Sequence, residues 1–259
     1  MKILSLLLPL AVQAAPDFTA IVVKGGGLWP QIQCSADGTL LAFGYNAAAH
    51  TTLPGDVDAW ASSDGGKTWS LRATAAARPD PQANMCHWAS GIGATGDVLV
   101  LASGMDDAAN ERGKRQPNDV RAFRSADFGK TWTKTGTFPA RVGGGLKPYP
   151  FGSIVRGADS RLQTVVYSAD EKHANAEAAW LMTSRDDSRS WQESGKIADG
   201  IDESVVLPLA EKNWLCVGRT SHSPARCSAP AANTPVTKPG NSHRSILPRL
   251  VNRRYFHRK

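Results

Sequence analysis

Short, mostly apolar runs separated by polar turns recur along the first 220 residues, and no stretch has the period of an amphipathic helix. In the first unit, "QIQCS" and "TLLAFGY" flank a tight turn at Ala36–Gly38. A third run follows at 58–63, and a fourth comes after another polar turn. Each unit of about sixty residues therefore predicts four short strands in series.

The same order recurs in two more units and begins again in a fourth. The second unit contains "CHWASGI" and "DVLVLAS", and the third contains "FGSIVRG" and "RLQTVVYS". The fourth opens with "ESVVLPL" and "WLCVGRT", but no third run follows. Serial four-stranded units are typical of β-propeller blades. The sequence thus predicts an all-β fold, an incomplete propeller of about three and a half blades over 15–220.

An eight-residue box closes the third strand of each full unit. The boxes read "SSDGGKTW" (62–69), "SADFGKTW" (125–132) and "SRDDSRSW" (184–191). An Asp can accept hydrogen bonds from turn amides, a Gly can take a positive φ, and a Trp can pack between sheets. We therefore interpret each box as a structural hairpin turn between the third and fourth strands.

Strand direction sorts the connections onto two faces. In an antiparallel blade the first-to-second and third-to-fourth turns lie on one face, and the longer loops lie on the other. We call these the turn face and the loop face. Because binding and catalytic residues concentrate on long loops of a rigid scaffold, we expect a site on the loop face.

The ends of the chain differ from the repeats. "MKILSLLLPLAVQAA" has a positive start, a short apolar run and small residues, which predicts a signal peptide over 1–14. The apolar run is too short to span a bilayer, and no later run is long enough, so no membrane span is expected. The mature protein is expected to be secreted or periplasmic.

The net charge of +7 comes from the C-terminal tail, residues 221–259. This tail has eight Lys or Arg and no Asp or Glu, and the remaining residues hold 22 basic and 23 acidic side chains. A basic arm for anionic partners, a disordered linker and a shifted reading frame are three interpretations. We favour the last, because strand period, acidic residues and box all vanish together after Thr220. Nucleic acid is not the expected partner.

Four cysteines, Cys34, Cys86, Cys216 and Cys227, allow three disulfide pairings in an exported protein, and buried free thiols are an equal alternative. No Cys or His spacing indicates a metal site, and no cofactor is expected.

The boxes and four-strand units resemble the sialidase (neuraminidase) superfamily, whose box is the bacterial neuraminidase repeat, or Asp-box. The resemblance covers about residues 19–220 and is more specific for fold than for activity. It implies a six-bladed propeller with a central site on the face away from the boxes. It also implies an exported glycoside hydrolase of the exo-sialidase type that acts on glycans, and a partner chain could complete the propeller.

Two site residues follow from the resemblance. The stretch "IDESVVLPLAEKNWLCVGRT" is similar to the segment that carries the family's catalytic Glu and one arginine of its carboxylate clamp. Glu203 matches the Glu, and Arg219 matches the Arg. Strand order independently places both on the loop face, where an Arg can bind a carboxylate in bidentate fashion. A structural ion pair between them is the alternative interpretation.

Elsewhere the chain departs from the family pattern. The first clamp arginine falls on Leu28, a second on Ala47, and the usual loop carboxylate falls on Leu53. Asp56 is the nearest acid, so Asp56 and Glu203 form our catalytic pair, and the family's Tyr nucleophile belongs to blades that are absent. Trp29 and Trp88 could stack on a sugar, but core packing is the commoner role. His50, His87 and His173 lie at or near the loop face, and each is more commonly an ordinary surface or hydrogen-bonded histidine than a catalyst. A non-catalytic carbohydrate-binding propeller is the alternative function.

Overall fold

The computed structural model describes residues 22, 28–47, 54–106, 116–168, 177–209, 214–220 and 226–227. In this part of the chain every regular element is a β-strand, and there is no helix that is long and apolar enough to cross a membrane. The predicted signal peptide (1–14) lies outside the described residues. So does most of the tail, of which only Arg226 and Cys227 are described.

The predicted strand order is confirmed in each unit. Blades 1 to 3 are antiparallel four-stranded units, and the fourth has two strands. Blade 1 contains β1 (Leu28–Cys34), β2 (Leu40–Tyr45), β3 (Val57–Ser62) and β4 (Ser70–Ala76). Blade 2 contains β5 (His87–Ile92), β6 (Val98–Ser103), β9 (Arg121–Ser125) and β10 (Thr133–Thr135). Blade 3 contains β11 (Pro148–Arg156), β12 (Leu162–Ser168), β13 (Ala178–Ser184) and β14 (Gln192–Asp199). Blade 4 contains β15 (Ile201–Pro208) and β16 (Trp214–Thr220).

Two short pairings were not predicted. The strands β7 (Met105–Asp106) and β8 (Gln116–Pro117) pair within the connection from β6 to β9. The strand β17 (Arg226–Cys227) comes from the tail and pairs with the end of β14.

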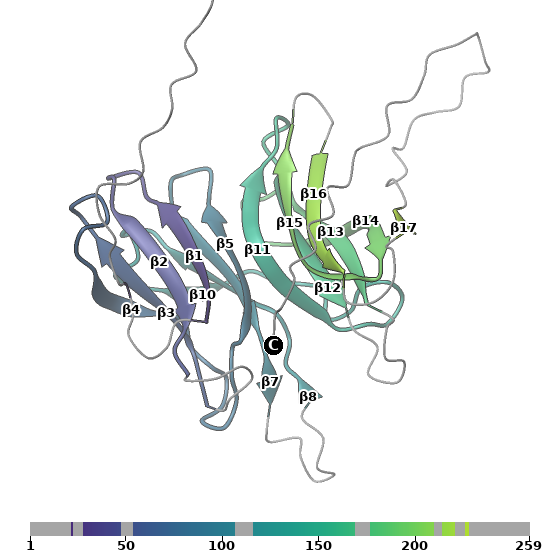
Figure 1. The fold of residues 1–259 in the computed structure, drawn as a ribbon, viewed down its shortest axis with the longest axis horizontal. Helices are drawn as coiled ribbons and strands as arrows, with labels where there is room; N and C mark the ends of the chain where they lie inside the picture. The colour runs from purple at the N-terminus through teal and green to yellow at the C-terminus, as the bar shows by residue number, and fades with distance from the viewer. Residues whose placement is uncertain are drawn as a thin grey trace, which may run out of the picture.

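The blades form an open arc around their inner strands, and β5, β11 and β15 succeed one another across the middle of Figure 1. Blades 2 and 3 also join by parallel pairing of β5 with β11, through Gly152 and Ala89, which merges them into one nine-stranded sheet with β17 at its end. The fold is therefore an incomplete β-propeller whose ring is not closed.

Apolar side chains fill the spaces between consecutive blades. Phe43, Val100 and Trp88 pack between blades 1 and 2, and Trp180 and Leu101 belong to the cluster between blades 2 and 3. A smaller cluster, which includes Val165 and Val206, joins blades 3 and 4. Alternating strand residues supply these layers because successive side chains point to opposite faces of a sheet.

Each box has the structural role that its sequence predicts. In the first, Asp64 Oδ1 accepts hydrogen bonds from the backbone amides of Lys67 and Thr68 (both 3.0 Å) and from Ser62 Oγ (2.7 Å). Its Oδ2 accepts a bond from Thr68 Oγ1 (2.6 Å), and Trp69 Nε1 donates to the Gly66 carbonyl (2.9 Å). The Asp carboxylate is thus saturated by its own turn.

An ion network links blades 2 and 3 on the turn face. Arg124 Nη1 contacts Asp97 (2.6 Å), and its Nη2 contacts Asp187 (3.0 Å) in the third box. Arg156 also binds Asp187 (3.2 Å), whose φ of 57° is left-handed. Burial would raise the pKa of Asp187, but the Ala94 amide and the two arginines outweigh it and lower that pKa. The network therefore fixes adjacent blades through a partly buried carboxylate.

Candidate functional site

Glu203 and Arg219 meet on the loop face, as the strand order predicts. Inner strand β15 starts at this face and β16 returns to it, so the two side chains lie side by side across antiparallel strands. Arg219 Nη1 and Glu203 Oε2 are 3.1 Å apart. An adjacent guanidinium favours the ionised carboxylate.

Asp202 is a third member of this group, which sequence reasoning missed. Arg219 donates from Nε to Asp202 Oδ1 (3.0 Å) and from Nη2 to Oδ2 (2.7 Å). Asp202 is buried, with 6% of its side chain exposed, whereas Arg219 is 61% exposed. The hydrogen bond to Asp202 is the main cause that raises the pKa of Arg219, with Glu203 as a further cause. Two carboxylates therefore share one guanidinium.

A cluster of aromatic rings lies next to these charges. Tyr167 Oη and His87 Nδ1 are 3.0 Å apart, and the Tyr149 ring stacks on Tyr167 with centroids separated by 5.2 Å. Burial, with the charge of Glu203 as the next cause, raises the pKa of Tyr167 well above its usual value. The phenol therefore keeps its proton, and its oxygen shares a hydrogen bond with His87 Nδ1. Such a protonated phenol is not a ready nucleophile.

Trp29 extends the cluster to the first blade. Its ring lies 6.4 Å from His87 and 6.2 Å from Tyr45, measured between centroids. The β1–β2 register is irregular between Leu28 and Gln31, and Trp29 has a φ of 52°. A left-handed backbone at a bulky residue is strained, and such strain is often found at functional sites.

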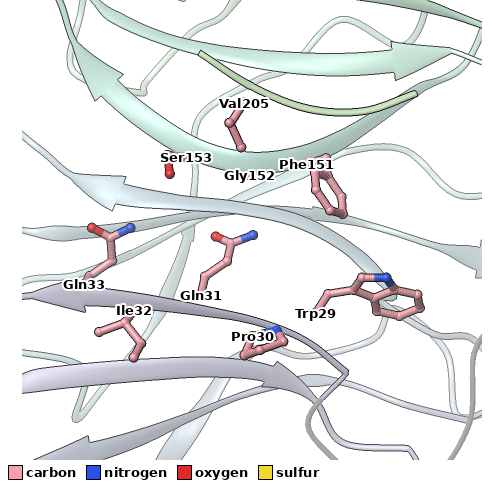
Figure 2. Close-up of a pocket in the computed structure, with 9 residues that line it drawn as sticks. All are labelled: Trp29, Pro30, Gln31, Ile32, Gln33, Phe151, Gly152, Ser153 and Val205. Atoms are coloured by element: carbon pink, nitrogen blue, oxygen red, sulfur yellow. The ribbon is translucent and has the colours of Figure 1, made fainter. Parts of the chain in front are cut away.

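A pocket of about 300 Å³ continues from Trp29 between the inner strands. Figure 2 shows β1 on one side, with Gln31 and Gln33 directed inward, and Phe151, Ser153 and Val205 opposite. Ser90 Oγ donates a hydrogen bond to Gln31 Oε1 (2.7 Å). Ser90 Oγ also accepts a hydrogen bond from Gln33 Nε2 (3.0 Å). The amides of β1 are thus positioned by β5. The volume of this pocket is at the lower end of the range for small-ligand pockets, which is about 300–1,000 Å³.

The structure places Asp56 in a different ion pair. Arg78 donates to Asp56 through Nη1 (2.6 Å) and through its backbone amide (2.7 Å). The Asp56 amide in turn donates to Asn46 Oδ1 (2.9 Å). Asp56 lies on the loop face, but these bonds hold it within blade 1. The structure therefore joins Glu203 to Arg219 and gives Asp56 a separate partner.

Other predicted positions have mixed outcomes. His50, Leu53 and His173 lie outside the described residues, and Ala47 is buried. His87 is mostly buried in the aromatic cluster and hydrogen-bonded to Tyr167, which agrees with the expectation of a hydrogen-bonded histidine. Trp88 is almost fully buried in the core, as the commoner role predicts. Cys34 is an exposed free thiol.

The described residues contain no group of three or more His, Cys, Asp or Glu side chains that could hold a metal ion. The polar groups described at the site are carboxylates, a guanidinium, an imidazole and phenols.

The fold is shared with several solved structures at low sequence identity, and two of the three described here are glycosidases. A protein of unknown function from Dyadobacter fermentans has a TM-score of 0.65 and 18% identity over 76% of this chain and 62% of its own. Hadza microbial sialidase Hz136 gives 0.61 and 18%, over 76% and 42%. A Penicillium chrysogenum α-L-arabinanase solved with arabinobiose gives 0.53 and 16%, over 76% and 58%.

No protein-family model matches the chain, and no curated protein matches it either. The chain spans between 42% and 62% of the length of these three structures. The likeness therefore shows a β-propeller fold of the kind found in sialidases and an arabinanase, of which this chain forms an incomplete arc.

Proposed function

We propose that this protein is exported and acts on glycans as a glycoside hydrolase, with Glu203 as the reactive carboxylate. The observation that carries the proposal is the ion pair of Glu203 with Arg219 (3.1 Å) beside the Tyr167–His87 pair, at the loop face near the axis. The site combines a carboxylate, aromatic surfaces and a pocket, as carbohydrate-processing sites require. Two glycosidases that share the fold support a glycan as the class of substrate.

The ion pair of Glu203 with Arg219 fits the role of a base. As a base, it would take a proton from water while the water oxygen bonds to the anomeric carbon. The bond from that carbon to the leaving oxygen breaks, and this oxygen must receive a proton from a second group. Asp56 is the first candidate donor, but it would have to leave Arg78 and take up a proton before it could donate one. Tyr167, whose phenol stays protonated beside His87, is the second.

Turnover of a panel of fluorogenic glycosides tests the proposal, with an N-acetylneuraminic acid reporter for the exo-sialidase form. We expect Glu203→Gln to lower kcat/KM by about a hundredfold or more. Glu193→Gln is a matched control, because Glu193 lies on the outer strand β14, where it accepts a hydrogen bond from the Gly143 amide (2.8 Å). The variants Asp56→Asn and Tyr167→Phe each remove one candidate proton donor. The variant with the larger loss of kcat identifies the group that protonates the leaving oxygen.

Three outcomes are informative. Equal turnover by Glu203→Gln and the unmodified protein would contradict the assigned role. Glycan binding without turnover, unchanged by Glu203→Gln, would favour a carbohydrate-binding propeller instead. Loss of turnover with unchanged unfolding free energy would support the hydrolase.

A further inference from the structure

The guanidinium of Arg219 already forms ion pairs with two carboxylates, those of Asp202 and Glu203. A guanidinium binds a carboxylate through one of its two-nitrogen edges. Asp202 occupies the edge formed by Nε and Nη2, at 3.0 and 2.7 Å, and Glu203 lies 3.1 Å from Nη1. An anionic ligand would therefore meet a guanidinium whose Nε–Nη2 edge is occupied and whose Nη1 already contacts a carboxylate.

Asp202 is the less replaceable of the two. Its side chain is 6% exposed, and its Oδ1 also accepts a hydrogen bond from the Glu203 amide (2.6 Å). A buried carboxylate that lost its guanidinium would be left with a large desolvation cost. The arginine is therefore held by a fixed internal anion.

The local charge also opposes an anion. Asp202 and Glu203 carry two negative charges against the single positive charge of Arg219. A substrate carboxylate placed beside Glu203 would meet a like charge, which disfavours binding.

The adjacent pocket has the lining that an uncharged sugar requires. Its nine lining residues include no ionisable side chain. Gln33 and Ser153 offer an amide and a hydroxyl to sugar hydroxyls, and Trp29 and Phe151 offer ring surface to the apolar side of a sugar. This observation is independent of the Arg219 geometry and indicates the same ligand class.

We infer that the site selects uncharged sugars over carboxylated ones, and that Asp202 enforces this selection by occupying Arg219. The inference rests on the proposed glycan-binding function of this face and adds the substrate class. Asp202 is a positioning residue here, because it acts on the ligand through the arginine.

Matched pairs of sugars test the selection on the unmodified protein. Methyl galactoside and methyl galacturonoside differ in one carboxylate, and lactose and sialyllactose differ in one acidic sugar. Dissociation constants from calorimetry or ligand-observed NMR should favour the neutral member of a pair by at least about tenfold.

The variant Asp202→Asn then tests the cause. It removes one charge with almost no change of volume and frees the guanidinium edge, so affinity for the acidic member should rise by about tenfold or more. Asp159→Asn is the control, since Asp159 pairs with Arg161 (3.1 Å) in a turn on the opposite face. The control should leave both affinities unchanged.

The outcomes separate this inference from the hydrolase proposal. Tighter binding of the acidic members by the unmodified protein would overturn the inference, whether or not any glycoside is hydrolysed. Unchanged preference in a folded Asp202→Asn would overturn the role of Asp202. Neutral-sugar binding without turnover would support the inference and contradict the hydrolase, and no binding of any sugar would contradict both.

Discussion

At the scale of single residues, the same carboxylate chemistry serves structure on one face and a candidate site on the other. Asp127 in the second box accepts hydrogen bonds from the backbone amides of Lys130 (3.1 Å) and Thr131 (2.9 Å) and from two hydroxyls. Glu203 is paired with a mostly exposed guanidinium instead. A carboxylate saturated by its own turn has no capacity left for a substrate.

Removing the charge of Asp127 should weaken the second box. Asp127→Asn replaces an acceptor oxygen with a donor that faces backbone amides, so we expect a loss of about 1 kcal/mol in the free energy of unfolding. Urea unfolding measures it. Lys130→Ala changes one charge in the same turn and should have almost no effect. If both variants unfold at the same urea concentration as the unmodified protein, the structural role of the box Asp is wrong.

The same residue gives a pH dependence with a defined sign. Burial would raise the pKa of Asp127, but hydrogen bonds led by Thr131 outweigh it and lower the pKa from 3.8 to about 2. Because the unfolded chain binds the proton more readily, this stabilisation is complete above about pH 4 and is lost as the pH falls towards 2. Acid unfolding followed by circular dichroism should be less steep over this range in Asp127→Asn. An identical acid transition would contradict it.

Sequence alone predicted the box residues and the Glu203–Arg219 pair but not Asp202 or the Tyr167–His87 pair. The boxes are local, so their hydrogen bonds follow from residue type and spacing. Tyr167 and His87 come from blades 3 and 2, and only the packing of those blades brings them together. Asp202 was not predicted because the family motif matches its neighbour Glu203 and assigns no role to Asp202.

At the scale of elements, blade order followed from the sequence, whereas the joint between blades did not. Alternating apolar runs predicted the strands of all four units. The parallel pairing of β5 with β11 depends on how closely two inner strands approach, and no periodicity encodes that distance. Gly91 permits the approach: a Cβ there would lie 2.2 Å from the Ile154 carbonyl oxygen.

The Gly91→Ala variant should disrupt this joint. The added methyl group would overlap backbone that cannot rotate away, so we expect a loss of about 2 kcal/mol or more in unfolding free energy. Gly144→Ala is the comparison, since Gly144 has open space around its Cβ position and a φ of 81°. It should lose roughly 1 kcal/mol from left-handed strain alone. Thermal unfolding measures the loss of stability in both variants. A smaller loss in Gly91→Ala than in Gly144→Ala would contradict the close approach of β5 and β11.

At the scale of the whole molecule, blade 4 has an apolar sheet face that none of the residues described in the structure covers fully. Val205 and Val217 are cross-strand partners, and Leu207 lies on the same face as Val205. Their exposed fractions are 39%, 43% and 54%. The opposite face, through Val206, packs against blade 3. An exposed apolar sheet face of this kind favours self-association.

Charged side chains on the exposed apolar face of blade 4 should reduce self-association without destabilising the fold. In the double variant Leu207→Lys and Val217→Lys we expect weaker binding of the dye ANS and less self-association on size-exclusion chromatography. The free energy of unfolding should change by less than about 0.5 kcal/mol, because both side chains already face solvent. A marked loss of stability would show instead that this face is packed within the chain.

Hydrogen–deuterium exchange with and without a bound oligosaccharide tests the central claim, a glycan site on the loop face at the inner strands, most directly. The account predicts slower exchange at the start of β11 and β15 and at the ends of β12 and β16 (Figure 1). These strand ends contain Tyr149, Glu203, Tyr167 and Arg219. Outer strands β4, β10 and β14 should be unaffected. Protection confined to those outer strands or to the box turns would contradict the account.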